Sequence, residues 1–290
     1  MIDYNPKSWL KLIFAFHKSD TFRILWKEIL YIGLFTTLVV VLELKFFPDA
    51  EVLEKLIGVY SLIGFVISLL LVFRTNTAYD RWWEGRRKWG ELVNDSRNLS
   101  LKLSNILKDE ADRDFFKRMI SNFAFASKEH LRNGVDFNEL NLNPAEFEFL
   151  RSKQHVPLGI TALMFSKINE LKSSGTISEL EVLYLERNLN SLMDSLGGCE
   201  RIKNTPIPFS YSLFIKKFIF VYVITLPLAF VQQFGYFAAL ISTFIFYILV
   251  SMEVLAEEIE DPFGTDDNDL PTDQLCFKIK ESVEQVFKNK

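Results

Sequence analysis

Residues 56–73 read LIGVYSLIGFVISLLLVF and contain no charged side chain. As an α-helix this run is about 27 Å long, close to the roughly 30 Å hydrocarbon thickness of a bilayer. Three more apolar runs cover residues 29–42, 218–234 and 235–252, and the first of them extends past two charges to residue 47. The alternative is a set of buried core helices in a soluble protein. Four runs of this length favour membrane spans.

The overall composition limits the class of protein further. The chain has 290 residues, of which 49% are hydrophobic and 24% charged, too many charges for a protein wholly inside lipid. Its two cysteines exclude a disulfide framework. Three histidines, His17, His130 and His155, lie far apart in the sequence and argue against a His-based metal enzyme. A net charge of −4 makes nucleic acid a poor partner.

Motifs typical of catalysis are missing from the sequence. It contains no Gly-rich phosphate loop, no H-E-x-x-H and no nucleophile elbow. We therefore expect that the chain is not an enzyme.

Basic residues predict the orientation in the membrane. They are frequent before the first run, after the second run and before the third, whereas the turns near residues 46–55 and 232–236 have few or none. The positive-inside rule then places both termini and the middle of the chain in the cytoplasm. We expect a multi-pass protein of the cell's inner membrane.

The sequence thus predicts an all-α membrane protein with four transmembrane helices per subunit, arranged as two hairpins, and a helical cytoplasmic region. Residues 1–28 form an N-terminal segment, interpreted equally well as an amphipathic helix on the membrane surface or as a helix packed on the rest of the protein. The other parts are a first hairpin at 29–73 (spans 29–47 and 56–73), the cytoplasmic region at 74–211, a second hairpin at 212–252, and an acidic loop with a C-terminal helix at 253–290.

Helical periodicity marks the middle region at residues 89–107, 114–131 and 177–196, and these helices can be continuations of the membrane helices. Breaks are predicted at Asn143-Pro144, at 155–157 and at 173–175.

Two groups of residues near the second run are candidates for function. Phe65, Leu69 and Phe73 recur at i, i+4 and i+8 and lie on one line of a helix, although from the period alone they face lipid or neighbouring helices. Arg81, Trp82 and Trp83 form a cationic and aromatic cluster after this run. Such a cluster is typical of interfacial anchoring, and cation–π contacts to neighbouring helices are a second interpretation.

An acidic stretch follows the last run. It contains nine carboxylates and no Lys, Arg or His: Glu253, Glu257, Glu258, Glu260, Asp261, Asp266, Asp267, Asp269 and Asp273. Clustered carboxylates after a Pro-Phe-Gly turn suit a hard cation such as Ca²⁺. The alternative is a solvated loop whose Asp residues cap the next helix.

Three stretches together resemble the bestrophin family, in particular its prokaryotic branch: FRTNTAYDRWWEGRRKWGELVND (residues 73–95), CERIKNTPIPFSY (199–211) and IEDPFGTDDNDLP (259–271). The resemblance runs in order over nearly the whole chain. It implies a pentameric ion channel with one central pore, in which the second helix of each subunit lines a narrow hydrophobic neck above a helical cytoplasmic vestibule. Phe65, Leu69 and Phe73 are the implied neck residues, and five copies of an apolar row form a constriction that can gate by dewetting.

The resemblance also implies residue roles outside the neck. A second, cytoplasmic aperture falls on residues 177–183, with Ile177 or Leu180 as candidates. In a Ca²⁺ site like that of animal relatives, Asp266 and Asp269 supply carboxylates, Asp261 and Glu258 offer backbone oxygens, and another ligand comes from the N-terminal segment. No cofactor is required. The partners implied are four further copies of the chain, the lipid bilayer and permeant inorganic ions.

Ion selectivity is predicted from charge near the outer mouth. The neck itself is uncharged, while the outer loop has four acidic residues (Glu43, Asp49, Glu51, Glu54) and two basic ones (Lys45, Lys55), so each subunit carries −2 and five carry −10. Such a ring enriches cations within a Debye length of about 8 Å. We therefore expect a slight preference for monovalent cations such as Na⁺ and K⁺. The alternatives are a chloride channel of the same architecture and a non-conducting membrane scaffold or regulator.

Overall fold

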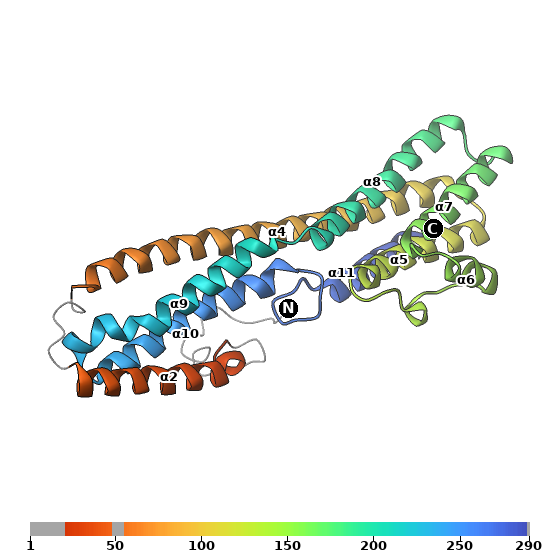
Figure 1. The fold of residues 1–290 in the computed structure, drawn as a ribbon. Coiled ribbons are helices and arrows are strands. Elements are labelled where there is room, and N and C mark those ends of the chain that lie inside the picture. The colour runs from red at the N-terminus through yellow and green to blue at the C-terminus, as the bar shows by residue number, and fades with distance from the viewer. Residues whose placement is uncertain (1–20, 48–54, 289–290) are drawn as a thin grey trace. The chain divides into compact units, whose positions relative to one another are not determined.

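The computed structural model describes residues 21–47 and 55–288, and all regular secondary structure within them is helical (Figure 1). The all-α class is therefore confirmed. The elements, in chain order, are α2 (Thr21–Phe46), α4 (Ile57–Ile106), α5 (Glu110–His130), the 3₁₀ turn η1 (Phe137–Glu139), α6 (Pro144–Arg151), α7 (Val156–Ser173), α8 (Glu179–Asn204), α9 (Phe209–Phe234), α10 (Phe237–Glu260) and α11 (Thr272–Lys288).

Four helices are long and apolar enough to cross a membrane, namely α2, α4, α9 and α10. The prediction of four candidate spans is thus confirmed. Helices α9 and α10 together begin before and end after the predicted range 212–252. Of the predicted N-terminal segment, the part up to residue 20 lies outside the described residues.

The chain divides into two compact units. The unit that we call the membrane unit extends to Trp82 and includes Pro206–Pro262 and Asp266–Asp269. The polar unit contains Trp83–Thr205, Phe263–Thr265 and the chain from Leu270 onward. Helix α4 contributes residues to both units, because it runs without a break from Ile57 to Ile106. The expectation that polar helices continue membrane helices is therefore confirmed for α4.

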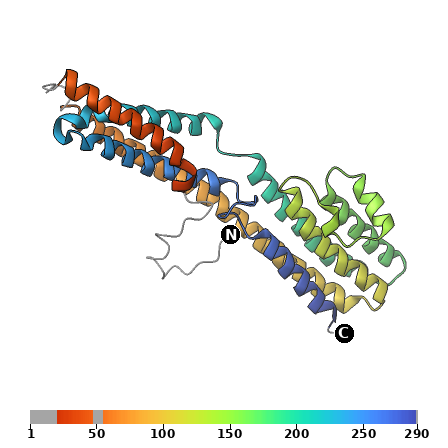
Figure 2. The same cartoon turned by 90° about the horizontal axis from the view of Figure 1, so that it is seen from below.

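Within the membrane unit, α2, α9 and α10 pack against one another and are seen side by side in two views (Figures 1 and 2). Helix α4 joins this core through Ile67 and Leu71, which are 1% and 3% exposed. Their hydrophobic cluster also contains Ile215, Ile219, Tyr222, Val223, Leu226, Phe246 and Leu249. Only one face of α4 is therefore used for packing within the subunit.

A glycine allows α4 to approach α9 closely. A Cβ atom added to Gly64 would lie 2.7 Å from the hydroxyl oxygen of Tyr222, nearer than two such atoms normally approach. The Tyr222 ring is itself nearly buried and packs 5.8 Å from the Tyr60 ring, centroid to centroid. The contact thus depends on the absence of a side chain at Gly64.

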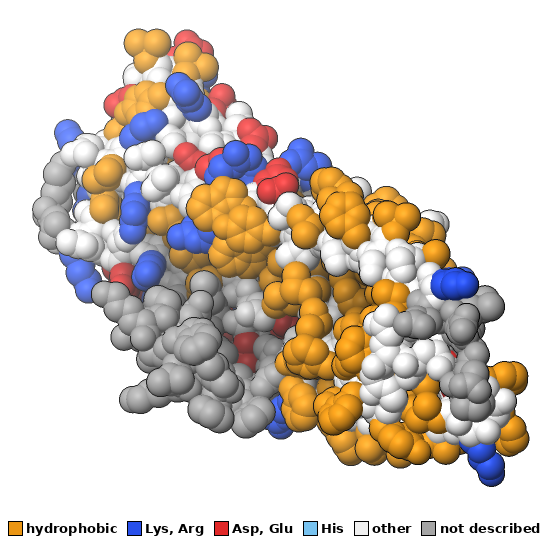
Figure 3. All heavy atoms as spheres, turned by 90° about the vertical axis from the view of Figure 1, so that its left-hand side faces the viewer, with side chains coloured by type: hydrophobic (Ala, Val, Ile, Leu, Met, Phe, Trp, Pro, Cys, Tyr) orange, Lys and Arg blue, Asp and Glu red, His pale blue; other side chains and the backbone are white. Residues whose placement is uncertain are grey.

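The surface of the membrane unit is largely hydrophobic. Large apolar side chains such as Leu34, Leu62, Phe220 and Phe244 are more than half exposed. Figure 3 shows hydrophobic side chains gathered in a continuous area with few charged groups. Exposing such an apolar surface to water is energetically unfavourable. Lipid or further copies of the chain would remove it from water.

In the polar unit, α5 packs against α11 and α7, and α7 also contacts α6 and α8. Side chains from several helices form its buried interior, among them Trp89, Leu99 and Leu103 of α4, Phe116 and Phe123 of α5, Leu185 and Leu192 of α8, and Ile279 and Val283 of α11. The leucines of residues 89–107 that follow helical periodicity are thus buried, as expected for the inner face of a helix.

Helix ends in the polar unit follow local sequence signals. Asn143 and Ser178 each form a capping box, with Glu146 and Glu181 respectively, at the starts of α6 and α8. His155 caps α7 through its Nδ1 atom, which accepts a hydrogen bond from the Leu158 N–H at 3.1 Å. The three predicted breaks are therefore helix boundaries in the structure.

Candidate functional site

The predicted neck residues lie on the face of α4 that does not pack within the subunit. Phe65, Leu69 and Phe73 are 66%, 45% and 56% exposed, while Ile67 and Leu71 on the opposite face are buried. A residue that lines a pore between subunits must be exposed in a single subunit. The three side chains meet this requirement, and so would side chains that face lipid.

The two aperture candidates differ in their surroundings. Leu180, in the first turn of α8, is 75% exposed, and Leu183 one turn later is 60% exposed. Ile177 precedes the helix and is only 3% exposed. A side chain buried inside its own subunit cannot line a passage between subunits, so the geometry favours Leu180 over Ile177.

Two members of the predicted interfacial cluster make hydrogen bonds within the membrane unit. The Arg81 Nε atom donates to the backbone oxygen of Glu260 at 3.1 Å, and the Trp82 Nε1 atom donates to that of Asn268 at 3.0 Å. Trp82 also stacks on Tyr79, whereas Trp83 is 56% exposed. Arg81 and Trp82 thus connect α4 to the end of α10 and to the acidic loop, a role that their sequence pattern did not indicate.

Arg74 was not identified as a site residue from the sequence, yet it is the most buried cation of the membrane unit's described residues, at 1% exposed. It bonds to Glu260 at 2.6 Å and lies 3.7 Å from Glu253, both on α10. The second oxygen of Glu260 accepts the Ile207 N–H at 2.6 Å. Glu260 therefore links α4, α10 and the Pro-Ile-Pro segment before α9.

In the acidic loop, Asp269 is the candidate cation ligand whose side chain is the most buried. Its side chain is 2% exposed, and its Oδ2 atom accepts the Asp266 N–H at 2.6 Å. Its buried Oδ1 atom has no hydrogen-bond partner within the described residues. Burial raises the pKa of this carboxyl to about 6.

The remaining candidate ligands are less enclosed. Asp261 and Asp266 are exposed. The Glu258 carboxylate accepts a hydrogen bond from the Asn268 amide at 2.6 Å. A Ca²⁺ ion would suit the free Asp269 oxygen. A further ligand is expected from the N-terminal segment, of which residues 1–20 lie outside the described residues.

Much of the acidic stretch is neutralised within the subunit. Four of its nine carboxylates form ion pairs: Glu253 and Glu260 with Arg74, Glu257 with Lys216, and Asp273 with Lys128 and Arg132. A paired carboxylate contributes little to the field at a distance. The stretch is therefore less negative in its effect than its composition suggests.

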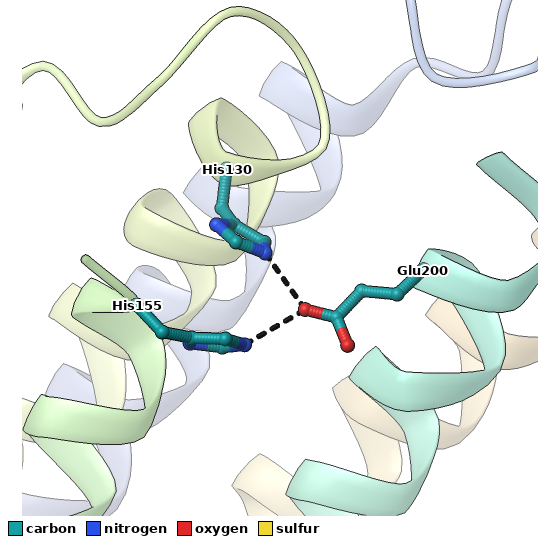
Figure 4. Close-up of side chains that lie close together, drawn as sticks. All are labelled: His130, His155 and Glu200. Atoms are coloured by element: carbon teal, nitrogen blue, oxygen red, sulfur yellow. Dashed lines mark hydrogen bonds and ion pairs between the residues drawn. The ribbon is translucent and has the colours of Figure 1, made fainter. Parts of the chain in front are cut away.

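A further cluster lies in the polar unit, where two histidines that are far apart in the sequence meet at one carboxylate (Figure 4). The Nε2 atoms of His130 and His155 lie 2.7 and 2.8 Å from the same oxygen of Glu200. The sequence separation that argued against a His-based metal enzyme therefore did not indicate that these two side chains lie close together in the fold. Helix periodicity does not reveal such a contact, because α6 and the loops around it determine how the chain returns.

Comparisons with known proteins match the chain almost from end to end. A family model described as Bacterial/Fungal Bestrophin protein matches residues 1–285. The chain is 32% identical over 288 residues to a voltage-dependent anion channel-forming protein of Nostoc sp., covering 97% of this chain and 92% of that protein. It is also 32% identical over 289 residues to a voltage-dependent anion channel-forming protein of Salmonella typhi, covering 99% and 94%.

A solved structure agrees with this result. The crystal structure of a bacterial bestrophin homolog from Klebsiella pneumoniae matches with a TM-score of 0.80 and 29% sequence identity, covering 90% of this chain and 98% of that one. The similarity therefore extends over both units of the fold.

Proposed function

This chain belongs to the bacterial and fungal bestrophin family, a family of channel type, and from this membership we propose that five copies form a channel that passes anions such as chloride. The pore follows the symmetry axis, and the neck is formed by Phe65, Leu69 and Phe73 of each copy. The channel lies in the inner membrane with both termini in the cytoplasm.

The exposed hydrophobic line on α4 carries this proposal. Three large apolar side chains lie on one helical line, and the opposite face of the same helix is buried. Five such lines around an axis form a narrow collar, which conducts when wet and blocks ions when it dries. A ring edge is the electropositive part of an aromatic side chain, so Phe65 and Phe73 offer anions a weak attraction without any charged group.

The slight cation preference expected from the outer loop is not supported. The relatives of Nostoc and Salmonella are named as anion channel-forming proteins. Glu43, one of the four acids counted at the mouth, is 4% exposed, whereas Lys45 and Lys55 are exposed. The other three acids lie outside the described residues. Glu43 is therefore a weaker source of exposed negative charge at the mouth than its place in the sequence suggested.

We further propose that the acidic loop binds Ca²⁺ through Asp269. Its buried, unpartnered oxygen supports this role, because a cation would compensate a carboxylate that is removed from water. When bound, the ion would supply positive charge that holds the loop in one conformation. Calorimetric titration of the purified protein with Ca²⁺ tests this, and loss of binding in Asp269→Asn is the expected result.

Reversal potentials test the main proposal. Purified protein is placed in a planar bilayer with a tenfold NaCl gradient, for which the chloride and sodium equilibrium potentials are about 59 mV on opposite sides of zero. We expect a reversal potential near the chloride value. A value near the sodium equilibrium potential would contradict anion selectivity, and a silent bilayer at high protein density would favour the non-conducting scaffold.

The neck is tested by changing its three side chains together. Phe65→Ala, Leu69→Ala and Phe73→Ala in one protein should raise the flux of chloride from liposomes, because a wider and less apolar collar stays wet. Phe220→Ala with Phe244→Ala is the matched control, since these exposed rings lie on α9 and α10. An equal change of flux in both proteins would argue that the α4 line faces lipid.

A further inference from the structure

We propose that His130, His155 and Glu200 form a binding site for Zn²⁺ in the polar unit. The three side chains come from the end of α5, the N-cap of α7 and the last part of α8, and they point toward one another (Figure 4). Their ligand atoms all lie within 4.8 Å of each other. This site is separate from the neck and from the acidic loop.

The geometry is close to that of a zinc site. The Nε2 atoms of His130 and His155 lie 2.7 and 2.8 Å from Glu200 Oε1. Zinc bonds of about 2.0–2.1 Å in a tetrahedron place neighbouring ligand atoms about 3.3 Å apart. Each nitrogen must therefore move away from the oxygen by only about 0.5 Å for an ion to enter. Small side-chain rotations provide this distance.

The three ligands are held at defined places of the fold. His130 is the last residue of α5, His155 is the N-cap of α7, and Glu200 is in the last part of α8. The two imidazole rings lie 4.3 Å apart, centroid to centroid, with an angle of 33° between their planes. Both Nε2 atoms lie next to the same carboxylate oxygen. The fold therefore brings the three ligands together before an ion binds, although the hydrogen bond that caps α7 has to change.

The ligand set selects the class of metal. Two imidazole nitrogens with one carboxylate suit Zn²⁺ and other late first-row divalent ions, whereas Ca²⁺ and Mg²⁺ prefer oxygen ligands. The side chains are 25%, 31% and 27% exposed in the order His130, His155, Glu200. Water can therefore reach the ion and complete its coordination. The neighbouring Arg201 pairs with Glu84, so its charge is partly compensated.

Zinc binding at Nε2 requires the proton of the neutral His155 ring to move from Nε2 to Nδ1. The Nδ1 atom of this ring accepts the Leu158 N–H, so the neutral ring carries its proton on Nε2 and donates it to Glu200. A metal bond at Nε2 requires the proton on Nδ1, and the cap of α7 then opens. Zinc and this cap therefore compete for the same ring, which weakens the site compared with one built on a free histidine.

The experiment begins with the wild-type protein, purified with an affinity tag that contains no histidine and treated with a chelator. We expect it to bind one Zn²⁺ per chain, with an X-ray absorption spectrum that shows two imidazoles and nitrogen or oxygen neighbours at about 2.0–2.1 Å. Mg²⁺ at the same concentration should not compete. A wild-type protein that binds no stoichiometric zinc, or a spectrum without imidazole, would overturn the proposal.

Variants then assign the ligands. His130→Asn and Glu200→Gln should each weaken zinc binding by more than about 100-fold, since loss of an outer-shell partner alone costs on the order of 10- to 100-fold. His155 is a less clean target because it also caps α7. Asp194→Asn removes an exposed carboxylate of the same helix α8 and should bind zinc as the wild type does. Equal affinity in all four proteins would place the ion elsewhere. Thermal unfolding of the chelated variants shows whether they are folded.

Discussion

Arg74 is nearly inaccessible to water, at 1% exposed, and is held between two carboxylates of α10. Removing one partner from a buried ion pair leaves the other charge in a medium of low dielectric constant. The pair is therefore costly to break, even where it adds little net stability. Glu260 would be left with only the Ile207 N–H at its side chain.

Arg74→Gln should lower the free energy of unfolding by about 3–5 kcal/mol, the range for a broken buried pair. Lys216→Gln is the matched control, because the Lys216–Glu257 pair is 47% and 45% exposed and such pairs contribute about 0–1 kcal/mol. Thermal unfolding of both proteins in the same detergent measures the difference. A similar loss of unfolding free energy in the two variants would show that the burial of Arg74 does not increase the contribution of its ion pairs to stability.

Asp273 makes the stability of the polar unit depend on pH in the acidic range. Arg132, which bonds to its carboxylate at 2.7 Å, and then Lys128 at 2.9 Å lower the pKa of Asp273 to about 2. The folded protein thus binds this proton more weakly than the unfolded chain, whose Asp pKa is about 3.9. The stabilisation is complete above about pH 4 and is lost as the pH falls through about 2.

We therefore expect Asp273→Asn to unfold with a flatter pH dependence than the wild type between about pH 4 and 2. The unfolding temperature measured across this range checks the result. Asp194→Asn, at an exposed position of α8, should keep the wild-type slope. If all three proteins lose stability equally on acidification, the ion pairs of Asp273 are not the cause.

At the scale of elements, the start of α8 combines a buried and an exposed apolar residue three positions apart. Ile177 contacts the interior of its own unit, and Leu180 projects outward. Their sequence environments are similar, so period alone could not separate them. The difference arises because the helix begins only after Ser178, which caps it.

Leu180→Ala should raise single-channel conductance and change the free energy of unfolding by no more than about 0.5 kcal/mol, since the side chain is exposed. Ile177→Ala should leave the conductance unchanged. It should lower the free energy of unfolding by about 2–5 kcal/mol, because removing the buried side chain creates a cavity. Bilayer recordings and thermal unfolding of the two variants serve as controls for each other. A conductance effect of Ile177→Ala alone would invert the assignment.

Local sequence signals predicted the elements well. Uncharged runs predicted the four candidate spans, and the predicted breaks at Asn143-Pro144 and at 155–157 are helix starts because caps and prolines act within one turn. Contacts between distant residues could not be predicted in this way. Arg74 and Glu260 are 186 positions apart, and His130 meets His155 only after η1 and α6. The predicted cation preference is not supported for a related reason, since charges at the outer mouth were counted before the burial of Glu43 was known.

For the whole molecule, the two cysteines provide a clean background for labelling. Cys199 and Cys276 are 1% and 0% exposed. Burial raises the pKa of the Cys199 thiol to about 12 and also raises that of Cys276. Neither forms the reactive thiolate readily. A single introduced cysteine should therefore report its own location.

We expect Lys55→Cys to react with a membrane-impermeant maleimide on intact cells, because it lies in the turn assigned to the outer face. Lys172 is exposed in the last turn of α7, and Lys172→Cys should react only after the inner membrane is permeabilised. Both substitutions replace an exposed lysine, so a difference in maleimide reactivity reports the side of the membrane on which each residue lies. The opposite pattern would invert the topology, and labelling of the unchanged protein would show that a native thiol is accessible.

The missing side chain at Gly64 has a consequence for genetic variation. Because even a methyl group would lie 2.7 Å from the Tyr222 hydroxyl, any other amino acid at this position requires Tyr222 or the helices to shift. Leu62, two residues earlier and 65% exposed, has no such neighbour requirement and should accept many apolar replacements. Saturation mutagenesis under selection for a working protein would thus show an intolerant site next to a permissive one.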